Sequence, residues 1–183
     1  GTDEFQEQPE SIELRDKITK PSYLWIFQRN LWVPEKYKAG VFVVYDEKGI
    51  GTSEELDIGE LEKALKGGRK LENGIKFSEE GKTGFAPRSS YKEGIFEKPE
   101  DFAKDGFIIV SNKEDGARNL AEVSQSKHFR VKTPYSWIVE PKDEPVQTLS
   151  AVGNGRYWVD NRLYFSGVHG YYRCSFGSGV LDY

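Results

Sequence analysis

The sequence predicts an α+β fold dominated by β-structure, with an antiparallel sheet or sandwich and two short helices to one side. Three observations support this class. Short apolar or alternating runs recur along the chain, helical spacing appears only twice, and the late connections have hairpin length, which only antiparallel strands allow. A chain of 183 residues is long enough to bury its own core. We therefore expect a tether with a first edge strand over residues 1–20 and a single β-rich domain over residues 21–183.

Strands are expected where apolar residues alternate with polar ones or form short runs. Ile12 and Leu14 alternate with polar neighbours, so the edge strand is expected there. Residues 23–27 and 40–45 are apolar throughout, which indicates strands covered on both faces, and the second run is rich in β-branched residues. In all, about nine or ten strands are expected. Later strands are predicted at 129–132, 135–139, 146–152 and within 155–176.

Two segments show the apolar spacing of helices. The first covers residues 52–65, begins with a hydroxyl cap and acidic residues, and ends at Gly67-Gly68, as a helix C-terminus commonly does. The second covers residues 112–123 and follows an expected strand at 106–110. Its apolar stripe is narrow, which indicates a helix lying on the surface of the sheet.

Residues 67–105 form a loop-rich stretch between the two helices. Only two short strands are expected in it, at 74–77 and 94–96. A stretch this long with so few elements is typical of a functional or mobile region.

The clearest hairpin signal lies at residues 155–167. Asp160-Asn161 tolerate the positive φ of a two-residue turn, which predicts that Trp158 pairs with Leu163 and Tyr157 with Tyr164. A third strand over 170–176 is expected to continue the meander. One face of the hairpin carries the better core residues, which are Tyr157, Val159, Leu163 and Phe165.

The opposite face of this hairpin mixes aromatic rings with charged groups. Tyr, Trp and Arg are enriched at binding surfaces, because a large ring or guanidinium supplies both apolar contact and a polar tip. The sequence therefore predicts a ligand-binding face here. Its candidate residues are Trp158, Arg162, Tyr164, Tyr171 and Arg173.

Other chemistries find little support in the residues. A net charge of −4 disfavours general nucleic-acid binding, and one Cys excludes an internal disulfide and a Cys-built zinc site. Cys174 and His169 are five residues apart, so a single strand would place them on opposite faces. We therefore expect Cys174 to be structural, and we expect no catalytic residue, no metal and no cofactor.

These observations predict an exported or surface-displayed, non-catalytic binding domain of the cell envelope, whose partner is a glycan, a surface protein or a second copy of itself. The polar, acidic start resembles the tether of a lipoprotein, with Gly1 where a lipid-anchored residue would stand. No apolar run approaches the length of a membrane span. Two alternatives stay open. One is a structural virion or appendage subunit, and the other is a small hydrolase whose active site forms only in the fold. A cytoplasmic location also stays open.

Overall fold

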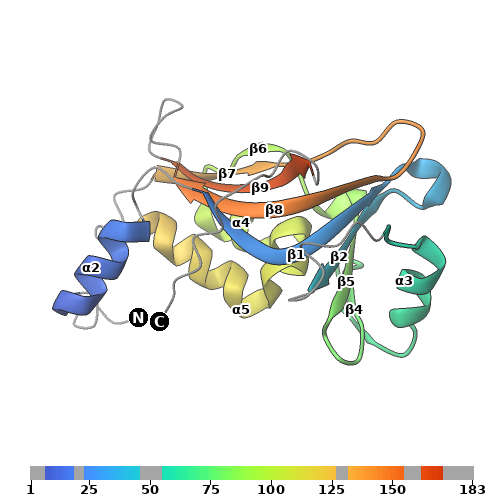
Figure 1. Cartoon of the computed structure of the whole chain (residues 1–183), viewed down its shortest axis with the longest axis horizontal. Helices are drawn as coiled ribbons and strands as arrows, with labels where there is room; N and C mark the ends of the chain where they lie inside the picture. Colours follow the sequence, from blue (N-terminus) through green and yellow to red (C-terminus); the bar gives the residue numbers. More distant parts are fainter. Residues whose placement is uncertain (1–6, 19–22, 46–54, 127–131, 155–161, 171–183) are drawn as a thin grey trace.

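A computed structural model describes residues 7–18, 23–45, 55–126, 132–154 and 162–170 (Figure 1). Within these ranges the strands form one nine-stranded mixed sheet in the order β3-β4-β5-β2-β1-β8-β9-β7-β6. All neighbouring strands are antiparallel except β7 and β9, which run parallel. The strands are β1 (Tyr23–Val33), β2 (Gly40–Tyr45), β3 (Arg69–Lys70), β4 (Lys76–Phe77), β5 (Thr83–Pro87), β6 (Gly94–Ile95), β7 (Lys132–Trp137), β8 (Val146–Asn154) and β9 (Arg162–Gly170).

Helices pack on both faces of this sheet, which confirms the α+β class but differs from the expected placement on one side. The described helices are α2 (Pro9–Ile18), α3 (Ile58–Ala64), α4 (Pro99–Lys104) and α5 (Gly106–Gln125), with 3-10 turns η1 (Glu35–Tyr37) and η3 (Arg88–Ser90). The face covered by α5 is called the inner face, and the face covered by α3 the outer face. In β1, Trp32 joins the inner core, whereas Leu31 joins the outer one. Because the central strands are apolar on both faces, both faces need a cover.

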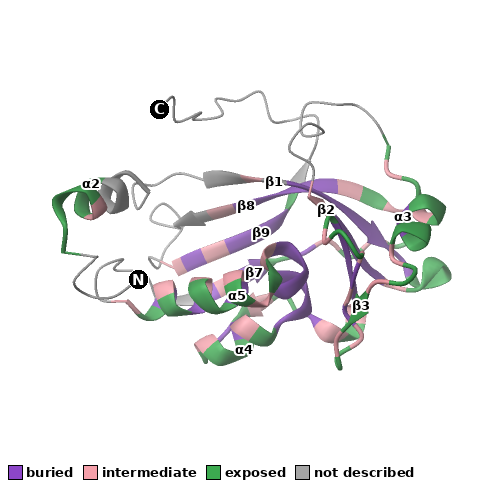
Figure 2. Ribbon diagram, turned by 90° about the horizontal axis from the view of Figure 1, so that it is seen from below, coloured by how far each residue is buried: buried purple, intermediate pink, exposed green. Residues whose placement is uncertain are grey.

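The inner core is built from aromatic rings of the sheet and of α5. Figure 2 shows that the central strands of the sheet are mostly buried. The ring of Phe107 on α5 lies 4.8 Å from that of Trp32 and 5.3 Å from that of Phe165, measured between centroids. All three side chains are completely buried. This packing sets which face of β9 turns inward and therefore which residues of that strand remain on the outer face.

A buried polar network connects β1 to β8. The Ser150 hydroxyl accepts hydrogen bonds from the amides of Gln28 (2.7 Å) and Asn30 (2.8 Å). The Thr148 hydroxyl accepts one from the indole N–H of Trp32 (2.8 Å) and donates one to a backbone carbonyl of β9 (2.6 Å). Buried polar groups need such partners, and a one-residue slip would separate them, so the network specifies the register of the two strands.

Two predicted strands are helical in the structure. Residues 106–110 form the first five residues of α5, where Asp105 caps the helix by accepting hydrogen bonds from the N–H groups of Phe107 and Ile108. This segment is buried on nearly every side, so it lacks the polar stripe by which a helix is distinguished from a strand. The expected edge strand at Ile12 is also wrong, because residues 9–18 form α2.

The predicted pairing of the C-terminal hairpin is wrong as well. Tyr164 pairs with Gly153 of β8, and Leu163 with Asn154, so neither pairs with residues 157–158. The other edge of β9 is occupied by β7, where Tyr164 pairs with Tyr135. Residues 155–161, which include the predicted turn, lie outside the described residues.

Candidate functional site

The structure places two of the five candidate binding residues, Arg162 and Tyr164, on the outer face of β9. Both are half-buried, whereas Leu163 and Phe165 are buried, which confirms the predicted alternation along this strand. The other three candidates lie outside the described residues, as does the lone cysteine. They are Trp158, Tyr171, Arg173 and Cys174.

Tyr164 belongs to a row of three rings on the outer face. Its centroid lies 5.7 Å from that of Tyr135, which lies 5.0 Å from that of Trp137, with interplanar angles of 44° and 41°. Trp137 is 42% exposed, a high value for so large a ring. We call Tyr135, Trp137 and Tyr164 the aromatic strip. It offers an outward apolar surface across two paired strands at one end of the sheet.

The strip carries phenol groups and has an acidic charge nearby. Burial raises the pKa of Tyr135, and the nearby charges of Glu93 and Tyr164 raise it further, so the phenol keeps its proton at neutral pH. Glu93 directly precedes Gly94, which pairs with Ser136 across β6 and β7, so its charge lies near this part of β7. The side chain of Ile95, 37% exposed, extends the apolar area because it pairs with Tyr135 across β6 and β7.

Sequence reasoning placed Tyr135 and Trp137 on a strand but did not assign them to the site. Two aromatic residues at positions i and i+2 share one face of a strand, and that signal was present in the sequence. Their meeting with Tyr164 depends on the parallel pairing of β7 and β9, which hairpin reasoning does not predict.

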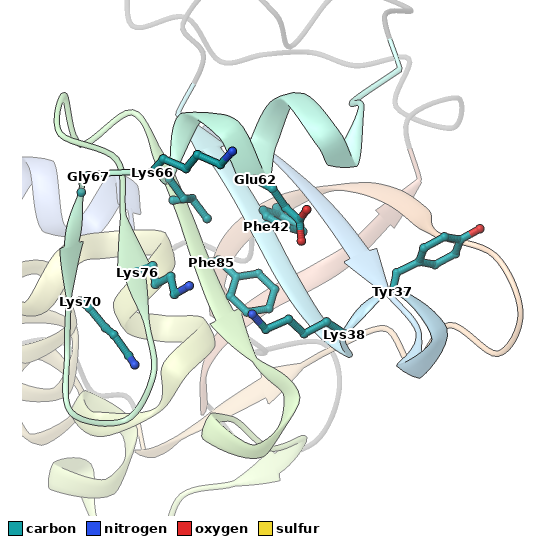
Figure 3. A pocket seen from close by; sticks show the side chains of 11 residues that line it. Tyr37, Lys38, Phe42, Glu62, Lys66, Gly67, Lys70, Lys76 and Phe85 are labelled. Carbon is teal, nitrogen blue, oxygen red and sulfur yellow. The ribbon is translucent and has the colours of Figure 1, made fainter.

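A second site lies at the other end of the sheet, where the outer face forms a cavity of about 460 Å³ between α3 and strands β2 to β5 (Figure 3). Its floor contains the rings of Phe42 and Phe85, 4.7 Å apart. Its walls carry one glutamate, Glu62, and four lysines. The lysines are Lys38, Lys66, Lys70 and Lys76, and we call this site the lysine groove.

The sheet register builds the floor of the lysine groove. Lys70, Lys76, Phe85 and Phe42 are successive partners across β3, β4, β5 and β2, so their side chains share the outer face. Gly68 brings the chain from α3 close to β4, since a Cβ there would lie 1.9 Å from the Phe77 carbonyl oxygen. This turn therefore holds Lys66 above the same floor.

A third hollow, of about 940 Å³, lies over the β4–β5 turn and contains Glu79 and Glu80. Both carboxylates are exposed, and Glu80 lies 3.5 Å from the amino group of Lys82. A general acid in a hydrolase is instead buried among apolar side chains, which raises its pKa. This pair therefore lacks the environment that hydrolysis would require.

Among the described residues, no three His, Cys, Asp or Glu side chains converge as metal ligands. No helix in the described part of the chain is both long and apolar enough to cross a membrane. Comparison with known proteins finds no match to this chain among family models, curated proteins or solved structures. The geometry of the aromatic strip and of the lysine groove is therefore the basis for any functional assignment.

Proposed function

We propose that this chain is a β-rich binding domain, exported or displayed on a surface, that binds a glycan on its aromatic strip. The observation that carries the proposal is the row formed by Tyr135, Trp137 and Tyr164, in which the indole is 42% exposed. A row of rings with an exposed indole lowers solubility, because exposed apolar patches on a monomer promote association. A ligand that covers the row would account for its presence.

The chemistry of the strip suits a sugar. A pyranose ring has one face made mainly of C–H groups, which packs on an aromatic ring, and hydroxyls at its edge, which need hydrogen-bond partners. Trp137 supplies the ring. The phenol groups of Tyr135 and Tyr164 and the nearby carboxylate of Glu93 supply partners at the rim.

A protein ligand fits this surface less well. Stable protein interfaces bury roughly 1,200–2,000 Å² in total. The described strip consists of three rings extended only by Ile95, and the half-buried Arg162 stands at the start of β9. A surface of that extent matches a few sugar units better than a folded partner.

Isothermal titration of the purified chain with cellohexaose, chitohexaose and laminarihexaose tests the proposal. We expect at least one of these to bind, and we expect Trp137→Ala to weaken that binding about tenfold or more, since one buried aromatic anchor often carries such an energy. The matched control is Tyr37→Ala, which removes another exposed aromatic ring, 38% exposed, far from β7 and β9.

Three results would contradict the glycan assignment. One is a wild-type chain that binds none of the three oligosaccharides. Another is an equal loss of affinity in Trp137→Ala and Tyr37→Ala. The third is a dimer in light scattering that Trp137→Ala converts to a monomer, because the strip would then be an interface between copies.

A further inference from the structure

We propose that the lysine groove is a second, independent binding site, specific for a small ligand that carries two phosphate groups. The groove has a formal charge of +3, from four lysines and one glutamate, on a chain whose net charge is −4. A positive cavity on an acidic protein focuses the local field and attracts anions that the rest of the surface repels.

Ion pairing distinguishes the lysines of the groove from a neighbouring arginine. None of Lys38, Lys66, Lys70 and Lys76 belongs to an ion pair in the described part of the chain. By contrast, the neighbouring Arg69 faces away from the groove and makes two hydrogen bonds to the Glu114 carboxylate, 2.7 and 2.8 Å long. The positive charge on the groove side is therefore available to a ligand.

The register adds a repulsion that an anion would relieve. Lys70 and Lys76 lie directly opposite each other across β3 and β4. Like charges in this position destabilise a strand pair. Figure 3 shows the amino groups of Lys38 and Lys76 near the Phe85 ring, with the Glu62 carboxylate projecting toward the same space from α3. The nitrogen of Lys38 is 6.0 Å from the centre of that ring.

The residue types suit phosphate groups. The ammonium of Lys is a compact point charge that donates hydrogen bonds to a tetrahedral oxyanion from many directions, and lysine commonly binds phosphate in this way. The groove is lined by four lysines and contains no arginine among its described lining residues. A phosphate ester carries about −1.5 to −2 charges at neutral pH, so two such groups match the charge of the groove. Its volume of about 460 Å³ also leaves room for the organic part of a small ligand.

Titration calorimetry with fructose 1,6-bisphosphate and with pyrophosphate, against sulfate at equal ionic strength, tests this inference. We expect the wild-type chain to bind a phosphate ligand at least about tenfold more tightly than sulfate. The double variant Lys38→Ala/Lys76→Ala should lose about tenfold or more in affinity. The matched control is Lys98→Ala/Lys142→Ala, which removes the same charge from two exposed sites outside the groove, and it should stay within about twofold.

A second measurement keeps the inference falsifiable if the groove variant does not fold. In the wild-type chain, amide resonances of Gly67 and Gly68 should shift on addition of the bisphosphate more than those of β7 and β9. The inference is overturned if sulfate binds as tightly as the phosphate ligands, if the control variant loses as much affinity as the groove variant, or if the shifts occur elsewhere. Trp137→Ala should leave phosphate binding unchanged, so failure of the glycan proposal would be seen separately.

Discussion

Asp105 offers the sharpest test of the structure, because its carboxylate holds three backbone N–H groups in a buried position. One oxygen accepts hydrogen bonds from Phe107 (3.0 Å) and Ile108 (3.2 Å), and the other accepts one from Lys92 (2.9 Å). Asp105→Ala removes a helix cap worth about 1 kcal/mol and leaves the Lys92 N–H without its partner, at a further cost of about 1 kcal/mol. We therefore expect the free energy of unfolding to fall by about 2 kcal/mol.

The same carboxyl group should make stability depend on pH. Burial raises the pKa of Asp105 from 3.8 to about 7, while hydrogen bonds from Lys92, Ile108 and Phe107 act in the opposite direction. The folded chain then binds this proton more tightly than the unfolded chain. The stabilisation from this proton is fully present below about pH 4 and is lost as the pH rises to about 7. The rise in pKa from 3.8 to about 7 corresponds to a stabilisation of at most about 4 kcal/mol.

Urea unfolding of the wild-type chain and of Asp105→Asn between pH 5 and pH 8 measures this effect. Asn keeps one accepting oxygen but does not titrate, so the difference between the two proteins isolates Asp105 from the other carboxylates. We expect the wild type to gain stability relative to Asp105→Asn as the pH falls. A difference that is constant, or that grows with pH, would show that the carboxylate is ionised in the folded state and that its hydrogen bonds outweigh its burial.

Two further predictions concern β9. Phe165→Ala should lower the free energy of unfolding by about 3–5 kcal/mol, because it leaves a cavity in the inner core. Tyr164→Ala on the outer face should lower it by less than about 1 kcal/mol. Thermal melts in which Tyr164→Ala is the less stable variant would reverse the face assignment. Gly167→Ala should cost about 1–3 kcal/mol in urea unfolding, because its Cβ would lie 2.6 Å from both Phe107 and Trp32; an unchanged midpoint would mean that these rings are not packed against β9.

The position of one central strand was accessible from the sequence. Strand β2 has the predicted bounds, residues 40–45, because a run of β-branched apolar residues next to Gly40 is a local signal. The end of the first helix near Gly67 was also predicted from the sequence, and the φ of +79° at this position suits glycine. Residues 106–110 were misread for the opposite reason. A segment buried on all sides has apolar residues at every position and therefore no hydrophobic periodicity. Only its packing in the fold distinguishes a helix from a strand there.

What the sequence determined by itself was the β-dominated class, most strands, and the alternation of β9 that sends Phe165 inward and Tyr164 outward. Only the tertiary structure decided which strands meet. The parallel contact of β7 with β9 assembles the aromatic strip, and the row from Lys70 to Phe42 across four strands assembles the lysine groove. The reason is physical: the tendency to form a strand depends on neighbouring residues, whereas partner and register depend on competition among all strand edges for burial and hydrogen bonds.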